Sequence, residues 1–409
     1  MIEPFRSDFN ARFTEAKYAA LTERLDRESS TKIEFRMAET PCFFEEAFLE
    51  KIVQAGVELT EQLVNDAAYL ERSRAAIPAE YHAPGQGSHP HFMTVDFGLV
   101  RNAAGELEPK LVEMQAFPSI FGFQPAFGRA YKEIFDLDPR LRYTFGDLTD
   151  EAYWALLREV IVADHDPANV VLLEIDPEHQ KTLPDFRLHE KHLGIRIVDI
   201  ATLEKQGSEL FYRDPKNGGK LTRIERIYNR AIVDELLRKQ VKLPFDYRDE
   251  LRVEWAGHPN WYFGISKFSI PYLDHPTVPA AVFLDDWFAG SGRDRLPAER
   301  EQWVLKPLYS FAGKGISFAP TDAELRAIPE EERHNFLLQE RVKFEPVIRT
   351  PEGMTQAEIR ILYVWPEGKR MVPMTNLVRM GRGMMMGVDH NRDKTWVGGT
   401  AGLYLPATK

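Results

Sequence analysis

Two carboxylates and one amide stand close together in residues 91–116, HFMTVDFGLVRNAAGELEPKLVEMQA, and could bind a divalent metal ion. A two-residue turn at Ala104-Gly105 is favoured because glycine tolerates positive φ. This turn places Asp96 directly opposite Glu113, and strand alternation adds Gln115 to the same face. Oxygen ligands of this kind suit Mg²⁺. The alternative is an amphipathic hairpin whose polar face is solvated.

The same register gives the hairpin an apolar face that points the other way. A slip of one residue would exchange the two faces, so the register decides whether the polar groups converge. The residues expected on the apolar face are Val95, Phe97, Leu99, Val112 and Met114.

A lysine and a glycine-rich loop much later in the chain could bind phosphate. Residues 303–307, WVLKP, read as a strand that carries Lys306, and SFAGKG follows at 310–315. Backbone N–H groups around Gly313, Lys314 and Gly315 can surround an anion, because glycine permits unusual dihedral angles. The segment is not a Walker A motif, since GKG lacks the following Ser or Thr. A simple hairpin turn is the alternative.

Together with LLQERVKF at 337–344 and AEIRILYVW at 357–365, these segments resemble the ATP-grasp superfamily, whose members use ATP to join a carboxylate to an amine. The metal hairpin precedes the lysine strand here. That order is similar to the circularly permuted glutathionylspermidine synthase type, in its synthetase part only. If the resemblance holds, the polar face of the hairpin must line a cleft toward Lys306.

The resemblance implies a role for each matching residue. The metal ligands would be Asp96, Glu113 and Gln115, with Gln115 where the family carries Asn. Phe117 stands where those synthases carry an acid, so the identity of the substrate does not transfer. The implied nucleotide-binding residues are Lys267 over the α-phosphate, Lys306, Gly313, Lys314 and Gly315 at the phosphates, Gln339, Arg341 and Val342 at adenine, and Glu345 at the ribose.

Arginines supply the remaining implied charge. Arg360 and Arg379 would contact the transferring phosphate or an acyl-phosphate, because a planar guanidinium suits charge spread over several oxygens. Arg230 would face the site from a strand end. The alternative is a structural Glu358–Arg360 or neighbouring ion pair, which is an equal interpretation for Arg379, and a surface lysine is an equal interpretation for Lys267. Asn391, Lys394, Gly398 and Gly399 lie near the family's closing loop, although the two glycines could also form a simple turn.

Composition narrows the class of protein. The formal net charge of −11 argues against a nucleic-acid or anionic-membrane partner, and the implied partners are small-molecule or peptide carboxylates and amines. The single cysteine, Cys42, excludes an intrachain disulfide, and its apolar neighbours favour a buried small residue over a nucleophile. No apolar run reaches about 18 residues, and no signal peptide is recognisable at the start, so we expect a cytoplasmic protein.

The patterning predicts an α+β protein with an ATP-grasp fold, circularly permuted, and a small Rossmann-like parallel-sheet domain. Residues 48–73 repeat apolar positions at helical spacing, and NVVLLEID at 169–176 followed by a polar helix and IRIVDI predicts parallel strands. We divide the chain into a helical region with the permuted metal-binding strands (1–160), a pre-ATP-grasp Rossmann-like domain (161–250), and the nucleotide-binding lid with core strands (251–409).

The function that these features predict is an ATP-dependent carboxylate–amine ligase that uses ATP and Mg²⁺ and works through an acyl-phosphate. Two other functions remain open. One is a non-catalytic nucleotide-binding protein that keeps the ATP-grasp fold, and the other is a phosphotransferase that acts on a small acid.

Overall fold

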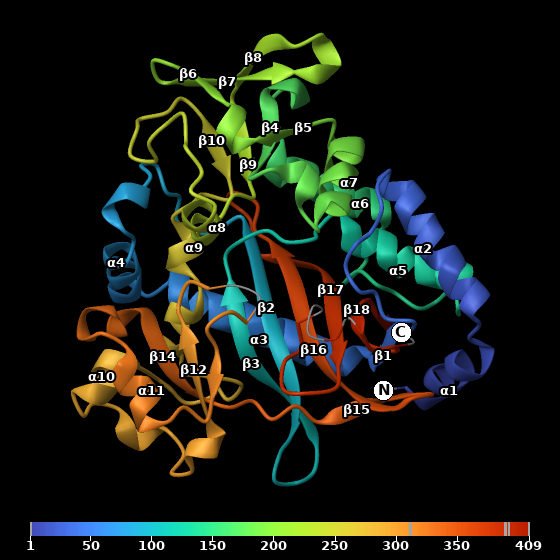
Figure 1. Cartoon of the computed structure of the whole chain (residues 1–409). Helices are drawn as coiled ribbons and strands as arrows, with labels where there is room; N and C mark the ends of the chain where they lie inside the picture. The colour runs from blue at the N-terminus through green and yellow to red at the C-terminus, as the bar shows by residue number, and fades with distance from the viewer. Residues whose placement is uncertain (1, 311–312, 388–390, 392, 408–409) are drawn as a thin grey trace.

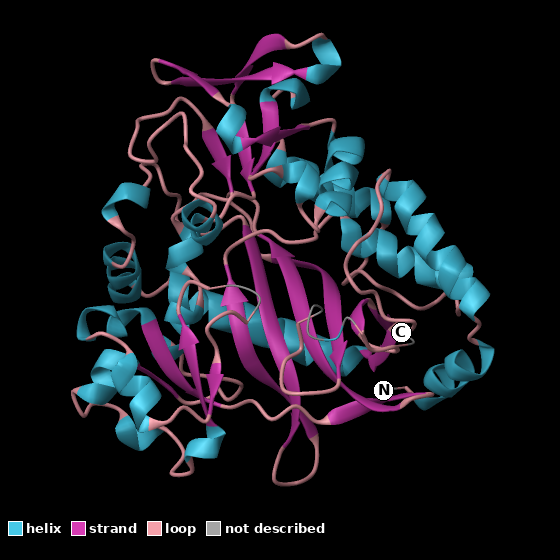
Figure 2. Ribbon diagram, in the orientation of Figure 1, coloured by secondary structure: helices cyan, strands magenta, loops and turns pink. Residues whose placement is uncertain are grey.

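The computed structural model describes residues 2–310, 313–387, 391 and 393–407. Phe311 and Ala312 of the predicted glycine loop lie outside the described residues, as do His390 and Arg392 beside the predicted closing loop. The chain is of mixed α and β structure, as predicted. Its strands gather in separate sheets with helices around them (Figure 2).

The central sheet is antiparallel and brings the early hairpin beside the late strands (Figure 1). Its order is β18-β17-β16-β2-β3, and β15 pairs with the remaining part of β16. Residues 92–115 therefore lie next to residues 353–381. The strands are β2 (Phe92–Arg101), β3 (Leu107–Gln115), β15 (Pro346–Thr350), β16 (Gly353–Val364), β17 (Val372–Gly381) and β18 (Gly398–Thr400).

The predicted pairing of Asp96 with Glu113 is confirmed, but the turn that was expected to produce it is wrong. Near the turn the pairing is shifted by one residue, because Arg101 rather than Asn102 lies opposite Leu107. Gly105 adopts a φ of 81° in the loop between the strands. A β-bulge then restores the register, because Phe97 pairs with Leu111 and the next pair is Asp96 with Glu113.

The bulge corrects one further expectation about the apolar face. The extra residue is Val112, which lines a cavity, and Leu111 takes the buried core position in its place. The other four predicted residues, Val95, Phe97, Leu99 and Met114, are buried in the core as expected.

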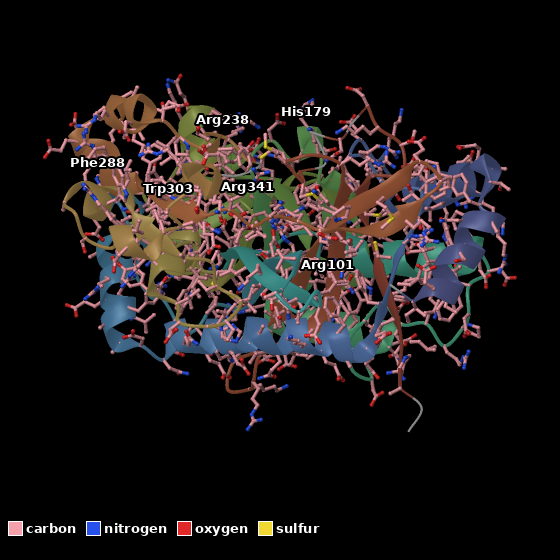
Figure 3. The ribbon with its side chains drawn as sticks, turned by 90° about the horizontal axis from the view of Figure 1, so that it is seen from below. Arg101, His179, Arg238, Phe288, Trp303 and Arg341 are labelled. Atoms are coloured by element: carbon pink, nitrogen blue, oxygen red, sulfur yellow. The ribbon has the colours of Figure 1, made fainter. Side chains whose placement is uncertain are left out.

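The helix predicted from residues 48–73 is two helices, and the first runs along one face of the central sheet (Figure 3). Apolar residues at helical spacing, among them Leu49, Ile52 and Leu59, are buried against that face. Asp66 caps the second helix by accepting hydrogen bonds from two backbone N–H groups, which explains the break. The helices are α3 (Glu46–Val64) and α4 (Ala67–Ala75).

A second sheet is parallel, in the order β10-β9-β4-β5, as the strand–helix–strand pattern predicted. Its helix α7 ends at Gly194, which adopts the left-handed conformation that favours glycine. A three-stranded antiparallel sheet adjoins it. These elements are α6 (Asp150–Ile161), β4 (Val170–Glu174), α7 (Leu183–Leu193), β5 (Arg196–Asp199), β6 (Glu204–Gln206), β7 (Glu209–Asp214), β8 (Lys220–Ile224), β9 (Arg226–Asn229), α8 (Val233–Arg238) and β10 (Glu254–Ala256).

A third sheet, in the order β11-β14-β12-β13, carries Lys306 on β12. Its elements are β11 (Ala281–Phe283), α10 (Leu284–Phe288), β12 (Trp303–Pro307), β13 (Ser317–Phe318), α11 (Asp322–Ala327) and β14 (Phe336–Glu340), preceded by α9 (Trp261–Gly264). Short 3-10 helices connect the sheets at Ala79–Tyr81, Pro167–Asn169, Pro177–His179, Ile200–Thr202, Pro215–Asn217, Lys267–Tyr272, Arg293–Arg295, Arg300–Gln302 and Glu330–Asn335.

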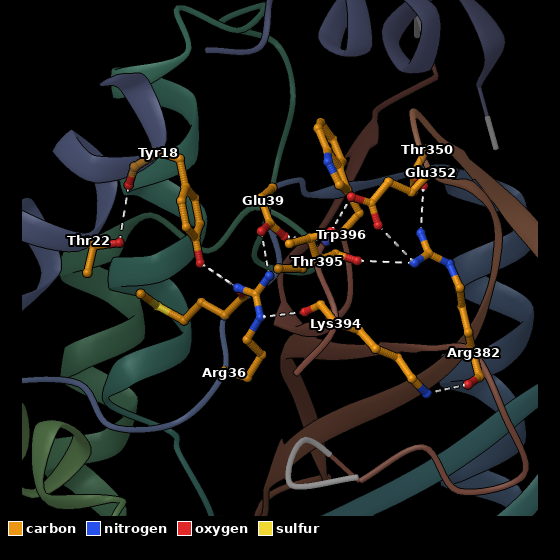
Figure 4. A network of polar contacts seen from close by, with 12 residues as sticks. Tyr18, Thr22, Arg36, Glu39, Thr350, Glu352, Arg382, Lys394, Thr395 and Trp396 are labelled. Atoms are coloured by element: carbon orange, nitrogen blue, oxygen red, sulfur yellow. Dashed lines mark hydrogen bonds and ion pairs between the residues drawn. The ribbon is translucent and has the colours of Figure 1, made fainter. Parts of the chain in front are cut away.

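An early and a late segment of the chain pair as two parallel strands, β1 (Cys42–Glu45) and β19 (Gly402–Leu405). Cys42 is fully buried, and burial raises the pKa of its thiol to about 12, so the expected packing role is confirmed. Nearby, Arg36 donates to the Lys394 carbonyl, and Glu39 accepts from the backbone N–H of Trp396 (Figure 4). Helices α1 (Glu3–Arg12), α2 (Glu15–Ser29) and α5 (Phe123–Ile134) complete this region. Within the described residues, no helix has the length and apolar character needed to cross a bilayer.

The contact between α3 and the central sheet generates a stability prediction. A Cβ added at Gly56 would lie 2.1 Å from the Tyr363 hydroxyl oxygen, which donates to the Val53 carbonyl. We expect Gly56→Ala to lower the free energy of unfolding by about 1–3 kcal/mol, because overpacking forces the ring away from its site. Urea denaturation measures this. Gly87→Ala is the control, since its nearest neighbour is 3.9 Å away, and equal stability of the two variants would contradict the packing.

Candidate active site

A cavity of about 510 Å³ lies where the three sheets meet, and both predicted halves of the site line it. The hairpin contributes Glu113 and Gln115, and β12 contributes Lys306, whose ammonium donates to the Val112 carbonyl at 3.2 Å. The expectation that the hairpin faces Lys306 is therefore confirmed for these two residues. The other predicted site residues that line the cavity are Arg230, Gly313, Gln339, Arg341, Val342, Arg360 and Arg379.

Asp96 is the exception on the hairpin, because it lies behind the cavity in a buried ion-pair network. Arg360 binds its carboxylate with two hydrogen bonds, from Nε at 2.5 Å and Nη2 at 2.6 Å, and Arg379 adds a third at 2.9 Å. Arg379 also pairs with Glu358, its neighbour across β16 and β17. Burial alone would raise the Asp96 pKa, but the two guanidinium charges outweigh it and hold the pKa below its usual value.

This network contains the structural ion pairs that were the alternative role of these arginines, although Arg360 pairs with Asp96 and it is Arg379 that pairs with Glu358. The same carboxylate cannot give all its lone pairs to guanidinium groups and to a metal ion at once. The metal role of Asp96 stays a prediction, and it requires Asp96 to exchange at least one arginine for the ion.

Two lysines lie close to the carboxylate of Glu113, Lys306 in the cavity and Lys267 in a small adjoining one. Glu113 forms an ion pair with Lys267 at 3.1 Å, and Lys267 donates to the Ser310 carbonyl at 2.5 Å. Burial lowers the pKa of Lys306 to about 8, and the charge of Glu113 only partly opposes this shift. Lys267 is itself buried and lines a small adjoining cavity with Glu113, so the surface-lysine alternative is excluded.

An apolar part of the cavity wall is suited to a purine. Apolar side chains of Val304, Phe318 and Val342 line it. Gln339 is 1% exposed, and its side-chain oxygen has no hydrogen-bond partner. A buried acceptor without a donor is costly, and the amino group of adenine is a donor of the right kind. On this observation, the residues present fit an adenine nucleotide.

Three predicted nucleotide contacts are not brought to the cavity wall. Glu345 forms an ion pair with Arg101 at 2.9 Å outside it, and Lys314 is exposed. Gly315, at a φ of 72°, packs toward Pro307. Gly398 and Gly399 lie in β18 rather than in a turn, which corrects that alternative. Asn391 is buried, and its amide donates to the carbonyls of Met385 and Gly387.

The sequence reasoning missed several cavity residues. Glu174 ends β4, so it is a charged residue at the carboxyl end of a buried parallel strand, where ligands bind in such sheets. That position was a usable signal. Met384, Met385 and Met386 also line the cavity, and only their adaptable apolar character hints at such a role.

The side chains at the cavity wall supply only part of the ligands that a metal ion needs. Glu113, Gln115 and Glu358 offer oxygen ligands at the cavity wall, which suits Mg²⁺. Across the described residues, however, no three His, Cys, Asp or Glu side chains cluster closely enough to hold a metal ion. Part of any coordination shell must then come from phosphate oxygens or water.

Comparisons with known proteins support the fold. No family model matches the chain, and no curated protein matches it by sequence. Among solved structures, 28 chains match. One is a glutathione synthetase-like effector (GSS30) from Globodera pallida in its apo form, with a TM-score of 0.56, 12% identity, and coverage of 96% of each chain. At this identity the likeness shows the fold alone, which is glutathione synthetase-like over nearly the whole chain.

The ion-pair network generates a prediction about stability. Asp96→Asn should lower the free energy of unfolding by about 3 kcal/mol or more, because Arg360 would remain buried without its counter-charge. Chemical denaturation measures the loss. Asp147→Asn removes an exposed partner of Arg142 and should change stability by less than about 1 kcal/mol. Similar small losses in both variants would show that the network does not support the sheet.

Proposed function

We propose that the protein is an ATP-dependent carboxylate–amine ligase of the ATP-grasp type, circularly permuted as in glutathionylspermidine synthases. One observation carries the proposal. The early hairpin and the late lysine strand, far apart in sequence, line a single cavity together with the parallel sheet. The glutathione synthetase-like fold is consistent with this function.

The cavity would bind ATP with adenine against Gln339 and Val342 and the phosphates beside Lys306 and Gly313. Lys267 would reach the phosphates after leaving Glu113, which it pairs with at 3.1 Å. Glu113 and Gln115, joined by Asp96 after it leaves an arginine, would hold Mg²⁺. The ion would neutralise phosphate charge during transfer.

The acid substrate would then react with the bound ATP. Its carboxylate oxygen attacks the γ-phosphorus of ATP, the bond to the β-phosphate oxygen breaks, and an acyl-phosphate and ADP form. The amine attacks the acyl carbon, and phosphate and a proton leave. Arg360 and Arg379 would stabilise the oxygens that gain negative charge, because both line the cavity and a guanidinium keeps its positive charge.

One observation favours the second candidate, a nucleotide-binding protein without turnover. Asp96 is held by two arginines, and catalysis would require this network to open. A phosphotransferase that acts on a small acid is the third candidate, because its reaction ends at the acyl-phosphate.

A phosphate-release screen over pairs of carboxylates and amines with MgATP tests the proposal. We expect release that depends on both partners, and we expect Glu113→Gln to abolish it, because the variant removes charge at constant size. Arg213→Gln, on an exposed residue of β7, is the matched control and should keep full release. Binding of ATP without release under any pair supports the non-catalytic protein. ADP formation that needs only the acid supports the phosphotransferase.

The lowered pKa of Lys306 generates a prediction about nucleotide binding. Below about pH 8 the ammonium is charged before ATP binds, whereas above pH 8 the free protein must take up a proton on binding. The affinity for a non-hydrolysable ATP analogue should therefore fall by up to about tenfold per pH unit above pH 8. Calorimetry between pH 7 and pH 9.5 measures it.

Two controls accompany this measurement. Adenosine lacks phosphates, so its affinity should not follow the same pH dependence. Lys306→Arg keeps its charge throughout this range and should flatten the profile for the analogue. A fall of the same size in Lys306→Arg would assign the titration to another group.

A further inference from the structure

A buried arginine in the cavity lacks the partners that such a charge needs. Arg230 follows directly after β9 and is 6% exposed, and it lines the cavity. Its Nε and Nη1 atoms have no hydrogen-bond partner. The guanidinium carbon lies near two aromatic rings, 4.9 Å from the centre of Phe117 and 5.4 Å from the centre of Phe186. The rings favour a cation but satisfy none of its N–H groups.

Three of the other cations on the cavity wall are in a different state. Lys306 donates to a backbone carbonyl, and Arg360 and Arg379 are bound to carboxylates. Each of these three must release an internal partner before the same N–H groups can bind a ligand. Arg230 needs no such exchange.

Two carboxyl groups share this end of the cavity with Arg230, yet neither neutralises it. No ion pair joins Arg230 to Glu174 or Glu235 within the part of the chain that the structure describes. Glu235 instead binds Lys239 at 2.7 Å. Burial raises the pKa of Glu174 to about 8 despite the nearby charge of Arg230, so this carboxyl is mostly protonated at neutral pH.

An unmatched buried cation is costly unless a ligand supplies the anion. We infer that Arg230 holds a second carboxylate of the acid substrate, one that does not react. This inference rests on the proposed ligase function. The reacting carboxylate must lie at the phosphate end beside Lys306, whereas Arg230 lies at the carboxyl ends of the parallel strands. A guanidinium binds a planar carboxylate with paired hydrogen bonds.

The substrate class is then an acid with two carboxylates, either a simple dicarboxylate or an amino acid or peptide that carries two. Binding without ATP tests this, which keeps the test separate from turnover. Calorimetry or ligand-observed NMR would compare succinate, glutarate and adipate with monocarboxylates of the same chain length. L-Glutamate is added to separate amino dicarboxylates from simple ones, and inorganic phosphate to test for a general anion site.

We expect at least one dicarboxylate or L-glutamate to bind at least about tenfold more tightly than its monocarboxylate, since a hydrogen-bonded charge pair contributes that much. Arg230→Gln should remove this difference while the melting temperature stays within a few degrees. Arg213→Gln, an exposed arginine of β7, should preserve it. Phe117→Glu should also remove it, because the new carboxylate would occupy Arg230 from within.

Three results would overturn the inference. They are equal binding of both acid classes to the unmodified protein, an unchanged preference in Arg230→Gln, and phosphate binding as tight as that of the best dicarboxylate. A preference for dicarboxylates in a protein that never releases phosphate would instead leave the Arg230 site standing and remove the ligase proposal.

Discussion

The central sheet depends on one buried set of charges, in which Asp96 on β2 binds Arg360 on β16 and Arg379 on β17. Each charge would be costly alone, so the three strands are held in the register that lets them pair. Glu358, also on β16, pairs with Arg379 as well. The network thus fixes the early hairpin against the late strands. Residues of both then line one cavity.

The hairpin links this network to the rest of the site. Asp96 and Glu113 are partners across the two strands, yet Asp96 faces arginines and Glu113 faces Lys267. The bulge at Val112 lies next to Glu113, and the Val112 carbonyl accepts the hydrogen bond from Lys306. One local irregularity therefore connects the central sheet to the sheet that carries the lysine. In the ligase we propose, nucleotide binding would exchange these internal partners for phosphate and metal.

Much of the fold could be predicted because it follows from local patterns. The apolar spacing of α3, the glycine that ends α7 and the apolar run of β4 are all local signals. The Asp96–Glu113 pair was predicted for a partly wrong reason. The pairing near the turn is shifted by one residue from the expected one, and the bulge shifts it back before Asp96. Bulges carry no such signal. The pairing of Asp96 with Arg360 joins residues 264 positions apart, so it depends on the assembled sheet and could not be predicted. The placement of Arg230 near Phe117 and Phe186 depends in the same way on elements that meet only in the assembled fold.

The central claim is that the hairpin and the lysine strand form one nucleotide site. A crystal structure of the protein with Mg²⁺ and a non-hydrolysable ATP analogue tests it most directly. The account predicts adenine against Gln339, phosphates between Lys306 and Glu113, and at least one arginine released from Asp96. Nucleotide bound elsewhere, or bound in this cavity with the Asp96 network intact and no contact to Glu113, would contradict it.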